Sequence, residues 1–269
     1  SNQIDSTLAF ASDQIGRTLT QIPTPANGYP MRVRSNGLWE LAPGSDWTSG
    51  YFAGVMWEMD RARPGRGWDT LATPFSLPLA GESAQSGDHF SRIWTTFKPL
   101  YDKTGSRQYR DVLLRAADAK LNQFSTKIKA FETPDLPSNS GDPSANFAIL
   151  VDQSMDMELL AWAGFETQRP IYRERAIAHL LTAIKYLQRP DGSVYQRAFF
   201  NRDTGQFIAG ENYQGHDNES TWSRGLAWAI HAWAEVAERT GIGNFAYAAQ
   251  RAADYWIANV PADKVPYWD

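Results

Sequence analysis

The sequence has no cysteine, no long apolar run and no surplus of positive charge. Without cysteine it can form no disulfide bond, thiolate metal site or thiol nucleophile. A membrane span needs roughly 18 consecutive apolar residues, and no run approaches that length. The net charge of −4 argues against a broad basic surface for nucleic acid. An anionic substrate would therefore have to be held by a few local Arg or Lys residues.

The composition suits a globular protein with a substantial core. The 269 residues allow one large domain or two small ones, and 42% of them are apolar. The 11 Trp are a high count, and Trp beside polar groups often faces sugar rings, although it is also ordinary core material. The chain starts with Ser and shows no signal peptide, so we expect a processed or engineered start, which leaves a removed export signal open.

The dominant pattern along the chain is helical. Apolar residues recur at spacings of three and four in eight segments, which predicts a helix in each. These segments are 4–20, 49–62, 88–103, 107–124, 152–165, 170–188, 221–239 and 243–259. Stretches rich in Pro and Gly separate them. The segment 190–212 could hold a short hairpin, but no alternating run is long enough for a sheet core, so we predict an all-α fold.

An internal repeat indicates how the helices are paired. A Thr-Gly pair at 104–105 is followed by Arg-Ala-Ala-Asp at 115–118, and Thr-Gly at 240–241 is followed by the same tetrapeptide at 251–254. Gly after a helix favours a left-handed C-cap, so each copy reads as an α-hairpin. Repeated α-hairpins close into a toroid or stack as a solenoid. The long polar loops between them suit a toroid with a site at one end.

Asp152 is the strongest single candidate for a chemical role. It follows an apolar run and opens a predicted helix in the segment ILVDQSMDMELLAWAG (149–164), where side chains usually point into the core. Burial raises the pKa of a carboxyl group, which is how proteins make a general acid for neutral pH. The commoner explanation is that Asp152 is a helix N-cap. Asp156 lies on the same helical face, and such a carboxylate pair could bind a metal, although no His lies nearby.

Three further segments carry polar or aromatic residues that a packed core does not require. Trp47 lies in a turn before a predicted helix, where it could be a sugar platform or a lid on the helix end. Asp88 opens another helix, with a role as N-cap as the alternative. Arg224 and Trp228 share a face in the helix after the polar loop that starts at Tyr213. They could bind an anionic sugar, or form a cation–π pair that closes the helix.

Several blocks in order along the chain resemble one known family. WTSGYF, the Asp88 segment up to TTF, VDQSMDMELLAWA, and YQGHDNESTWSRGLAW followed by VPYWD look like the unsaturated glucuronyl hydrolases of glycoside hydrolase family 88. The related unsaturated rhamnogalacturonyl hydrolases share the fold but match these blocks less well. The resemblance implies an (α/α)6 barrel, with residues 1–269 as a single catalytic domain. Relative to the family, we expect the last C-terminal helices of that barrel to be absent.

The resemblance also implies a reaction. The family removes a 4,5-unsaturated uronic acid from the non-reducing end of oligosaccharides left by polysaccharide lyases. Protonation at C4 and addition of water at C5 of the vinyl ether replace the usual attack at the anomeric carbon. No metal or organic cofactor is implied. The expected partner is the unsaturated oligosaccharide, with no nucleic acid or membrane, in the periplasm or cytoplasm of a polysaccharide-degrading bacterium.

Roles carry over residue by residue. Asp152 corresponds to the general acid/base and Asp88 to a second carboxylate that positions substrate and tunes the first. A helix N-terminus would lower the pKa of Asp152, whereas a neighbouring carboxylate would raise it. The residues matching substrate-contacting positions are Trp47 at the pocket mouth, Gln214, Arg224 and Trp228.

Some positions depart from the family pattern. Gly87 and Gln196 stand where His is usual, and Phe131 stands at a subsite position that is usually Trp. His216 occupies a position that is often aromatic or small, where it could substitute for a lost His. These departures keep two alternatives open. One is a degenerate carbohydrate-binding paralogue. The other is a different (α/α)6 enzyme, such as an unsaturated rhamnogalacturonyl hydrolase or an inverting hydrolase of saturated sugars.

Overall fold

The computed structural model describes residues 2–85, 87–133 and 137–269, and these divide into two compact units, 1–119 and 120–269. That the whole chain forms a single barrel domain stays a prediction.

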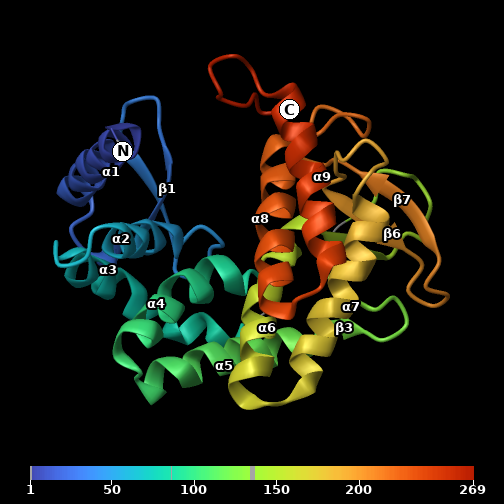
Figure 1. The fold of residues 1–269 in the computed structure, drawn as a ribbon, viewed down its shortest axis with the longest axis horizontal. Helices are drawn as coiled ribbons and strands as arrows, with labels where there is room; N and C mark the ends of the chain where they lie inside the picture. The colour runs from blue at the N-terminus through green and yellow to red at the C-terminus, as the bar shows by residue number, and fades with distance from the viewer. Residues whose placement is uncertain (1, 86, 134–136) are drawn as a thin grey trace. The chain divides into compact units, whose positions relative to one another are not determined.

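The first unit is built from helices and one β-hairpin (Figure 1). Its elements are α1 (Asn2–Gln21), β1 (Tyr29–Val33), β2 (Trp39–Ala42), α2 (Tyr51–Ala62), α3 (Trp68–Ser76), the 3-10 segment η2 (Leu77–Ala84), the π-helical turn η3 (Phe90–Trp94), α4 (Thr95–Thr104) and α5 (Arg107–Leu121). The last of these continues into the second unit. The sequence pattern did not predict α3, because it is short and contains Pro74.

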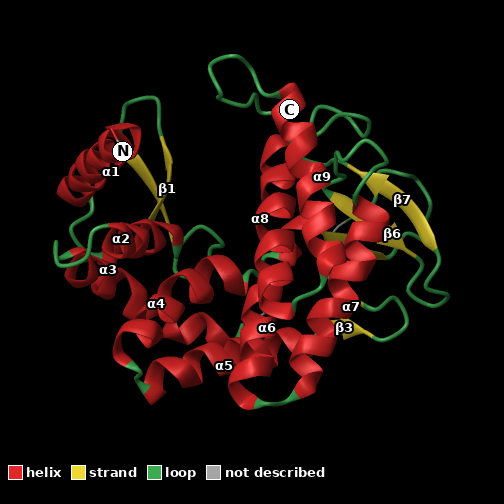
Figure 2. Cartoon of the chain, in the orientation of Figure 1, coloured by secondary structure: helices red, strands yellow, loops and turns green. Residues whose placement is uncertain are grey.

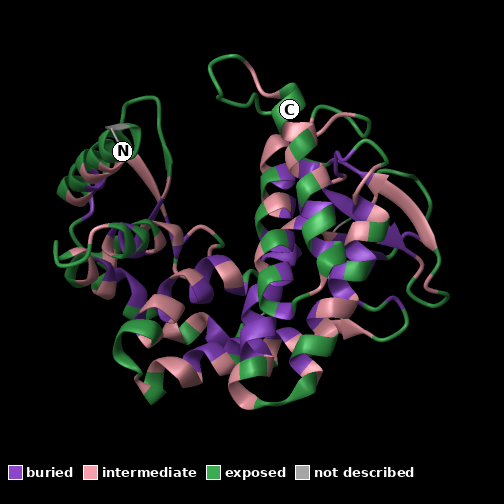
Figure 3. Cartoon of the chain, in the orientation of Figure 1, coloured by how far each residue is buried: buried purple, intermediate pink, exposed green. Residues whose placement is uncertain are grey.

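The second unit combines two helical hairpins with a small sheet (Figure 2). Its elements are β3 (Phe124–Ser125), β4 (Ala130–Phe131), β5 (Phe147–Leu150), the 3-10 turn η4 (Val151–Ser154), α6 (Asp156–Thr167), α7 (Pro170–Leu187), β6 (Arg197–Phe200), β7 (Phe207–Glu211), α8 (Ser223–Thr240) and α9 (Gly243–Asn259). Buried residues concentrate along α6 and on one face each of α7, α8 and α9 (Figure 3). The core of this unit therefore lies between the helical hairpins.

The hairpin predicted in 190–212 is confirmed as β6 and β7, and β5 joins them in an antiparallel sheet of order β5-β6-β7. Leu150 pairs with Arg197, which pairs with Glu211 across the other edge of β6. The sequence showed no alternation here because all four residues of β6 are buried. The sheet carries the ends of β5 and β7 to the same side, which positions the candidate site.

Both Thr-Gly turns close helical hairpins as predicted. Gly105, after α4, has a φ of 63°, and Gly241, after α8, has a φ of 72°. In each turn the glycine N–H donates to a carbonyl four residues earlier in the helix, which is the αL C-cap that glycine favours. Of the Arg-Ala-Ala-Asp tetrapeptides, Ala116 and Ala252 are fully buried. The repeated tetrapeptide therefore places a small buried residue in the second helix of each hairpin, where that helix packs closely against its neighbours.

A buried polar cluster lies inside the second unit. Lys120 and Asp156 form an ion pair of 2.8 Å, with each side chain at most 2% exposed. His179 is fully buried, and its Nδ1 accepts a hydrogen bond of 3.1 Å from the N–H of Phe131. Burial, together with the neighbouring Lys120 charge, lowers the pKa of His179 to about 3. His179 is therefore neutral in the folded protein at physiological pH.

Because the pKa of His179 is lowered, we expect the folded protein to lose stability in mild acid. His179 binds a proton in the unfolded chain near its ordinary pKa of 6.5 but not in the folded protein until about pH 3. Its contribution is therefore complete above pH 6.5 and is lost as pH falls toward 3, at up to about 1.4 kcal/mol per pH unit. Urea unfolding at pH 7, 6 and 5 should show this slope in the wild type and a flatter one in His179→Gln. Equal slopes in the two proteins would contradict the prediction.

Candidate active site

Asp152 lies where a strand turns into a helix. It is the second residue of η4, directly after β5, and it is partly buried. The N–H of Val151 donates to the carbonyl of Gln196 at 2.8 Å, which ties this turn to the chain entering β6. The interpretation of Asp152 as a helix N-cap is wrong. The cap position of η4 is Leu150 and that of α6 is Met155, because a 3-10 turn separates the strand from the helix.

Asp156, the other carboxylate of this face, is engaged in structure. It opens α6 and forms the buried ion pair with Lys120. In the residues that the structure describes, no group of three or more His, Cys, Asp and Glu is arranged to hold a metal ion. The Asp156 carboxylate is already neutralised by a buried ammonium group, so the arrangement gives no support to a metal site at Asp152 and Asp156.

Three of the predicted substrate-contacting residues come together beside this turn. Gln196 and Gln214 form two hydrogen bonds: Nε2 of Gln196 donates to Oε1 of Gln214 at 2.6 Å, and the N–H of Gln214 donates to Oε1 of Gln196 at 2.7 Å. Nη2 of Arg224 donates to the same Oε1 of Gln214 at 3.4 Å. Residues from the start of β6, the loop after β7 and the first turn of α8 therefore form one polar group next to η4.

The start of α8 orients the guanidinium of this group. Arg224 lies 4.3 Å from the ring of Trp222, which is only 3% exposed. A guanidinium stacked on a buried indole has few alternative positions. Trp228 follows one helical turn later, half-buried on α8, as the spacing predicted. The arrangement presents a fixed cation and an aromatic side chain on the same helix.

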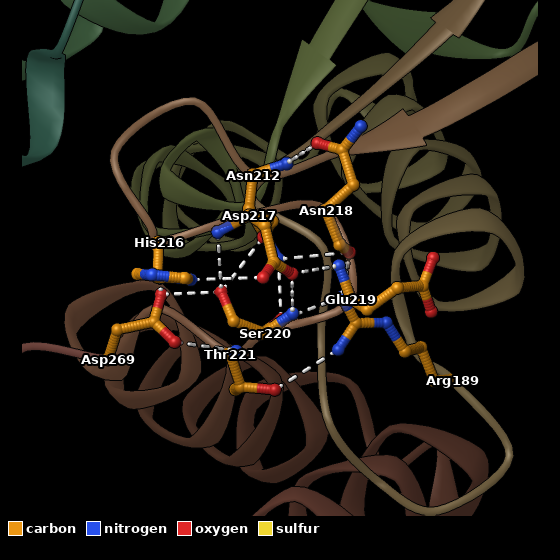
Figure 4. A network of polar contacts seen from close by, with 9 residues as sticks. All are labelled: Arg189, Asn212, His216, Asp217, Asn218, Glu219, Ser220, Thr221 and Asp269. Carbon is orange, nitrogen blue, oxygen red and sulfur yellow. Dashed lines mark hydrogen bonds and ion pairs between the residues drawn. The ribbon is translucent and has the colours of Figure 1, made fainter.

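His216 lies apart from the glutamine pair. Its side chain is 74% exposed, and its Nδ1 lies 3.0 Å from Oδ2 of Asp217. This contact and two backbone N–H groups lower the pKa of the Asp217 carboxyl. His216 thus contacts its own loop (Figure 4). Among the contacts of the described residues, none joins its imidazole to Gln196, one of the two positions where a usual His is missing.

Trp47 and Asp88 belong to the first unit. Trp47 lies in the turn before α2, is 39% exposed, and packs edge-to-face on Tyr51 with 5.9 Å between ring centroids. Asp88 is exposed and directly precedes His89, the first helical residue of this segment, so the interpretation of Asp88 as a helix N-cap stays a prediction. A π-helical turn follows it, a geometry often found at functional sites that the sequence pattern did not predict.

Arg92 holds these two turns together. It is 3% exposed, donates from Nε to the carbonyl of Asp88 and from Nη1 to the carbonyl of Ser45, both at 3.3 Å, and pairs with Glu82 at 3.5 Å. Gly87 has a φ of 114°, and a Cβ there would lie 3.1 Å from Nη2 of Arg92. Both facts favour glycine at this position, where the family usually has His.

Phe131 is placed differently from its predicted role. Its ring is fully buried in β4 and packs edge-to-face on Phe124, with 5.0 Å between centroids, and beside His179. A ring without exposed surface offers no face to a sugar. Phe131 is thus a core residue of the β3–β4 pair. A match to a family at one position cannot show whether an aromatic residue packs in the core or contacts a sugar.

Buried side chains that no sequence motif indicated support the loop after β7. Arg197 and Glu211 form a buried ion pair of 2.7 Å, each 1% exposed. Glu211 also accepts hydrogen bonds from the hydroxyl of Ser138 and the N–H of Asn139. The guanidinium of Arg197 lies 4.7 Å from the ring of Tyr213, which is 63% exposed. The available signal was that both residues lie in the predicted hairpin segment 190–212; the structure adds the register that pairs them.

Comparison with known proteins identifies close similarities. The family model described as Glycosyl Hydrolase Family 88 matches residues 32–242. The unsaturated glucuronyl hydrolase of Bacillus sp. strain GL1 is 28% identical over 271 residues, which cover 96% of this chain and 69% of that protein. A crystal structure of an unsaturated glucuronyl hydrolase specific for heparin has a TM-score of 0.89 at 28% identity and covers 98% of this chain and 70% of that one.

A third similar protein was solved with a sugar. This structure of an unsaturated glucuronyl hydrolase variant with dGlcA-Glc-Rha-Glc has a TM-score of 0.83 at 26% identity, and it covers 95% of this chain and 67% of that one. The chain thus spans about two thirds of the length of the proteins it matches. Their fold is the (α/α)6 barrel, so the predicted fold class is confirmed. Among the described residues, none of the helices has the length and apolar character that a membrane span requires.

Proposed function

This chain belongs to glycosyl hydrolase family 88, and on that premise we propose that it removes a 4,5-unsaturated uronic acid from the non-reducing end of oligosaccharides. The proposed substrates are unsaturated glucuronyl oligosaccharides of the kind that lyases release from glycosaminoglycans. The names of the similar proteins support this substrate class.

The observation that carries the proposal is the polar group beside η4. Gln196, Gln214 and Arg224 converge from three separate segments, and the carbonyl of Gln196 is bonded to the residue before Asp152. A guanidinium binds a carboxylate through two parallel hydrogen bonds, and the neighbouring amides can bind sugar hydroxyl groups. Such a group suits a uronic acid, which has one carboxylate and several hydroxyls.

The proposed mechanism uses Asp152 twice. Its carboxyl group delivers a proton to C4 of the substrate, where the electron pair of the C4–C5 double bond forms the new C–H bond. The positive charge that this leaves on C5 is shared by the ring oxygen. The carboxylate then takes a proton from the water that adds to C5 and forms a hemiketal. Breaking the bond between C5 and the ring oxygen leaves a ketone at C5 and a hemiacetal at C1. The hemiacetal collapses to an aldehyde and releases the shortened oligosaccharide.

The remaining predicted residues keep supporting roles in this proposal. On the family resemblance alone, we propose Asp88 as the second carboxylate, which positions substrate and tunes the pKa of Asp152. The carbon-13 chemical shift of the Asp152 carboxyl, followed through a pH titration, should report a lower pKa in Asp88→Asn. An unchanged titration would remove this role. Trp47 and Trp228 are proposed as aromatic contacts for sugar rings.

The activity can be tested directly. Purified chain is mixed with unsaturated disaccharides prepared by lyase digestion of several polysaccharides, and the ultraviolet absorbance of the conjugated double bond is followed. We expect the absorbance to decay with the release of free reducing sugar. A saturated disaccharide of the same composition is the control and should remain intact. No decay with any member of the panel would reject the proposed function.

A conservative substitution tests the proposed carboxylate contact. Arg224→Lys keeps the charge but cannot form two parallel hydrogen bonds, so we expect KM for an unsaturated disaccharide to rise about tenfold with a smaller change in kcat. Arg202→Lys is the matched control, because Arg202 lies in the turn after β6 and pairs with Glu132. Similar KM values for Arg224→Lys and the wild type would contradict the role.

A further inference from the structure

The last two residues of the sequence lie against the loop that carries Gln214, here called the Gln214 loop (residues 213–222). The carboxylate of Asp269 accepts three hydrogen bonds from this loop (Figure 4). The donors are the N–H of His216 at 2.7 Å, the hydroxyl of Ser220 at 2.7 Å and the N–H of Thr221 at 3.1 Å. One carboxylate thus joins His216, in the first half of the loop, to Ser220 and Thr221 near its end.

Trp268 holds Gln214 itself. Its indole Nε1 donates to the carbonyl of Gln214 at 2.8 Å, and its own carbonyl accepts from the N–H and the hydroxyl of Ser223 at 3.2 and 3.1 Å. The side chain of Gln214 is bonded to Gln196. Gln196 thus holds the side chain and the N–H of Gln214, whereas Trp268 holds its carbonyl, and Arg224 directly follows Ser223.

The loop is shaped to receive this segment. A Cβ at Gly215 would lie 2.5 Å from Oδ2 of Asp269, so a larger residue there would displace the carboxylate. Asp217 accepts from the N–H groups of Glu219 and Ser220, which closes the tip. On another side, Arg189 donates to the carbonyls of Asn218 and Ser220 and to the hydroxyl of Thr221 (Figure 4).

We propose that Trp268 and Asp269 are positioning residues for substrate binding, because they fix Gln214 and the start of α8 in the arrangement that receives the uronic acid. This inference rests on the proposed function. An exposed polar loop of this length has many conformations in isolation, and ordering it when substrate binds would weaken affinity. Ordering it beforehand through Trp268 and Asp269 removes that cost.

Two variants test the inference at separate atoms. Trp268→Phe keeps an aromatic ring but removes the indole N–H that donates to Gln214. Asp269→Asn keeps the shape but replaces an accepting oxygen with an NH2 group, which faces donors in the loop. Asp263→Asn is the matched control, because Asp263 lies in the same C-terminal segment and its side chain accepts from Val265 rather than from the loop. All three are compared with the wild type by steady-state kinetics on an unsaturated disaccharide and by amide hydrogen exchange.

We expect Asp269→Asn to raise KM about tenfold and Trp268→Phe about threefold, with kcat within twofold, since one hydrogen bond contributes about 1 kcal/mol. Amide exchange in residues 213–223 should accelerate about tenfold in Asp269→Asn, while Asp263→Asn leaves both measurements unchanged. Unchanged exchange in Asp269→Asn overturns the inference, and so does faster exchange with unchanged KM. An inactive wild type would instead reject the proposed function, while the exchange measurement would still decide whether Asp269 orders the loop.

Discussion

Asp152→Asn lowers kcat for an unsaturated disaccharide by about 10³-fold while KM changes little. A positioned acid/base contributes about 10²- to 10⁴-fold, and the amide can neither deliver the proton to C4 nor accept one from water. The substitution changes few packing contacts, because Asn has the size of Asp. Loss of the double-bond absorbance over time measures the effect.

The matched control is Asp203→Asn, which changes an exposed carboxylate in the turn between β6 and β7 of the same unit. We expect it to keep kcat within twofold of the wild type. The far-ultraviolet circular dichroism and melting temperature of both variants should match the wild type. An Asp152→Asn protein that keeps a tenth or more of wild-type kcat would remove Asp152 from the mechanism.

Lys120→Met lowers the free energy of unfolding by about 3–5 kcal/mol. The substitution leaves the Asp156 carboxylate, which is 2% exposed, in the core without the ammonium group 2.8 Å away. An uncompensated buried charge has a cost of this size, whereas replacing both members of a pair can be neutral. Urea unfolding followed by circular dichroism measures the change.

The double variant Lys120→Met with Asp156→Leu separates charge from packing. It should recover most of the lost stability, because neither charge then remains in the core. If Lys120→Met does not fold, recovery of a soluble protein in the double variant carries the same information. A loss below about 1 kcal/mol in the single variant would show that the pair matters little.

Local sequence patterns predicted the elements on which the site is built. Periodicity placed α7 and α9 nearly to the residue, and the Thr-Gly pairs identified the turns at Gly105 and Gly241. These features depend on neighbours within one helical turn, which a sequence displays directly. The same patterns could not show the 3-10 turn around Asp152 or the π-helical turn after Asp88, because both depend on how the chain changes direction.

Family-like blocks also pointed to Gln196, Gln214 and Arg224 before any contact between them was visible. Their convergence follows from the pairing of β6 with β7 and the return of the chain into α8. The catalytic and binding roles proposed for them remain predictions that the assays above address.

By itself, then, the sequence determined the helical hairpins, the family and the segments that carry the candidate site. The tertiary structure alone decided which polar side chains are buried in support of that site. Phe131 became core beside His179, and Asp156 became the partner of Lys120. Asp269 reached His216 across 53 positions of sequence. Such contacts depend on how separate elements pack, and no local periodicity records the distance between residues that meet only after the chain has folded.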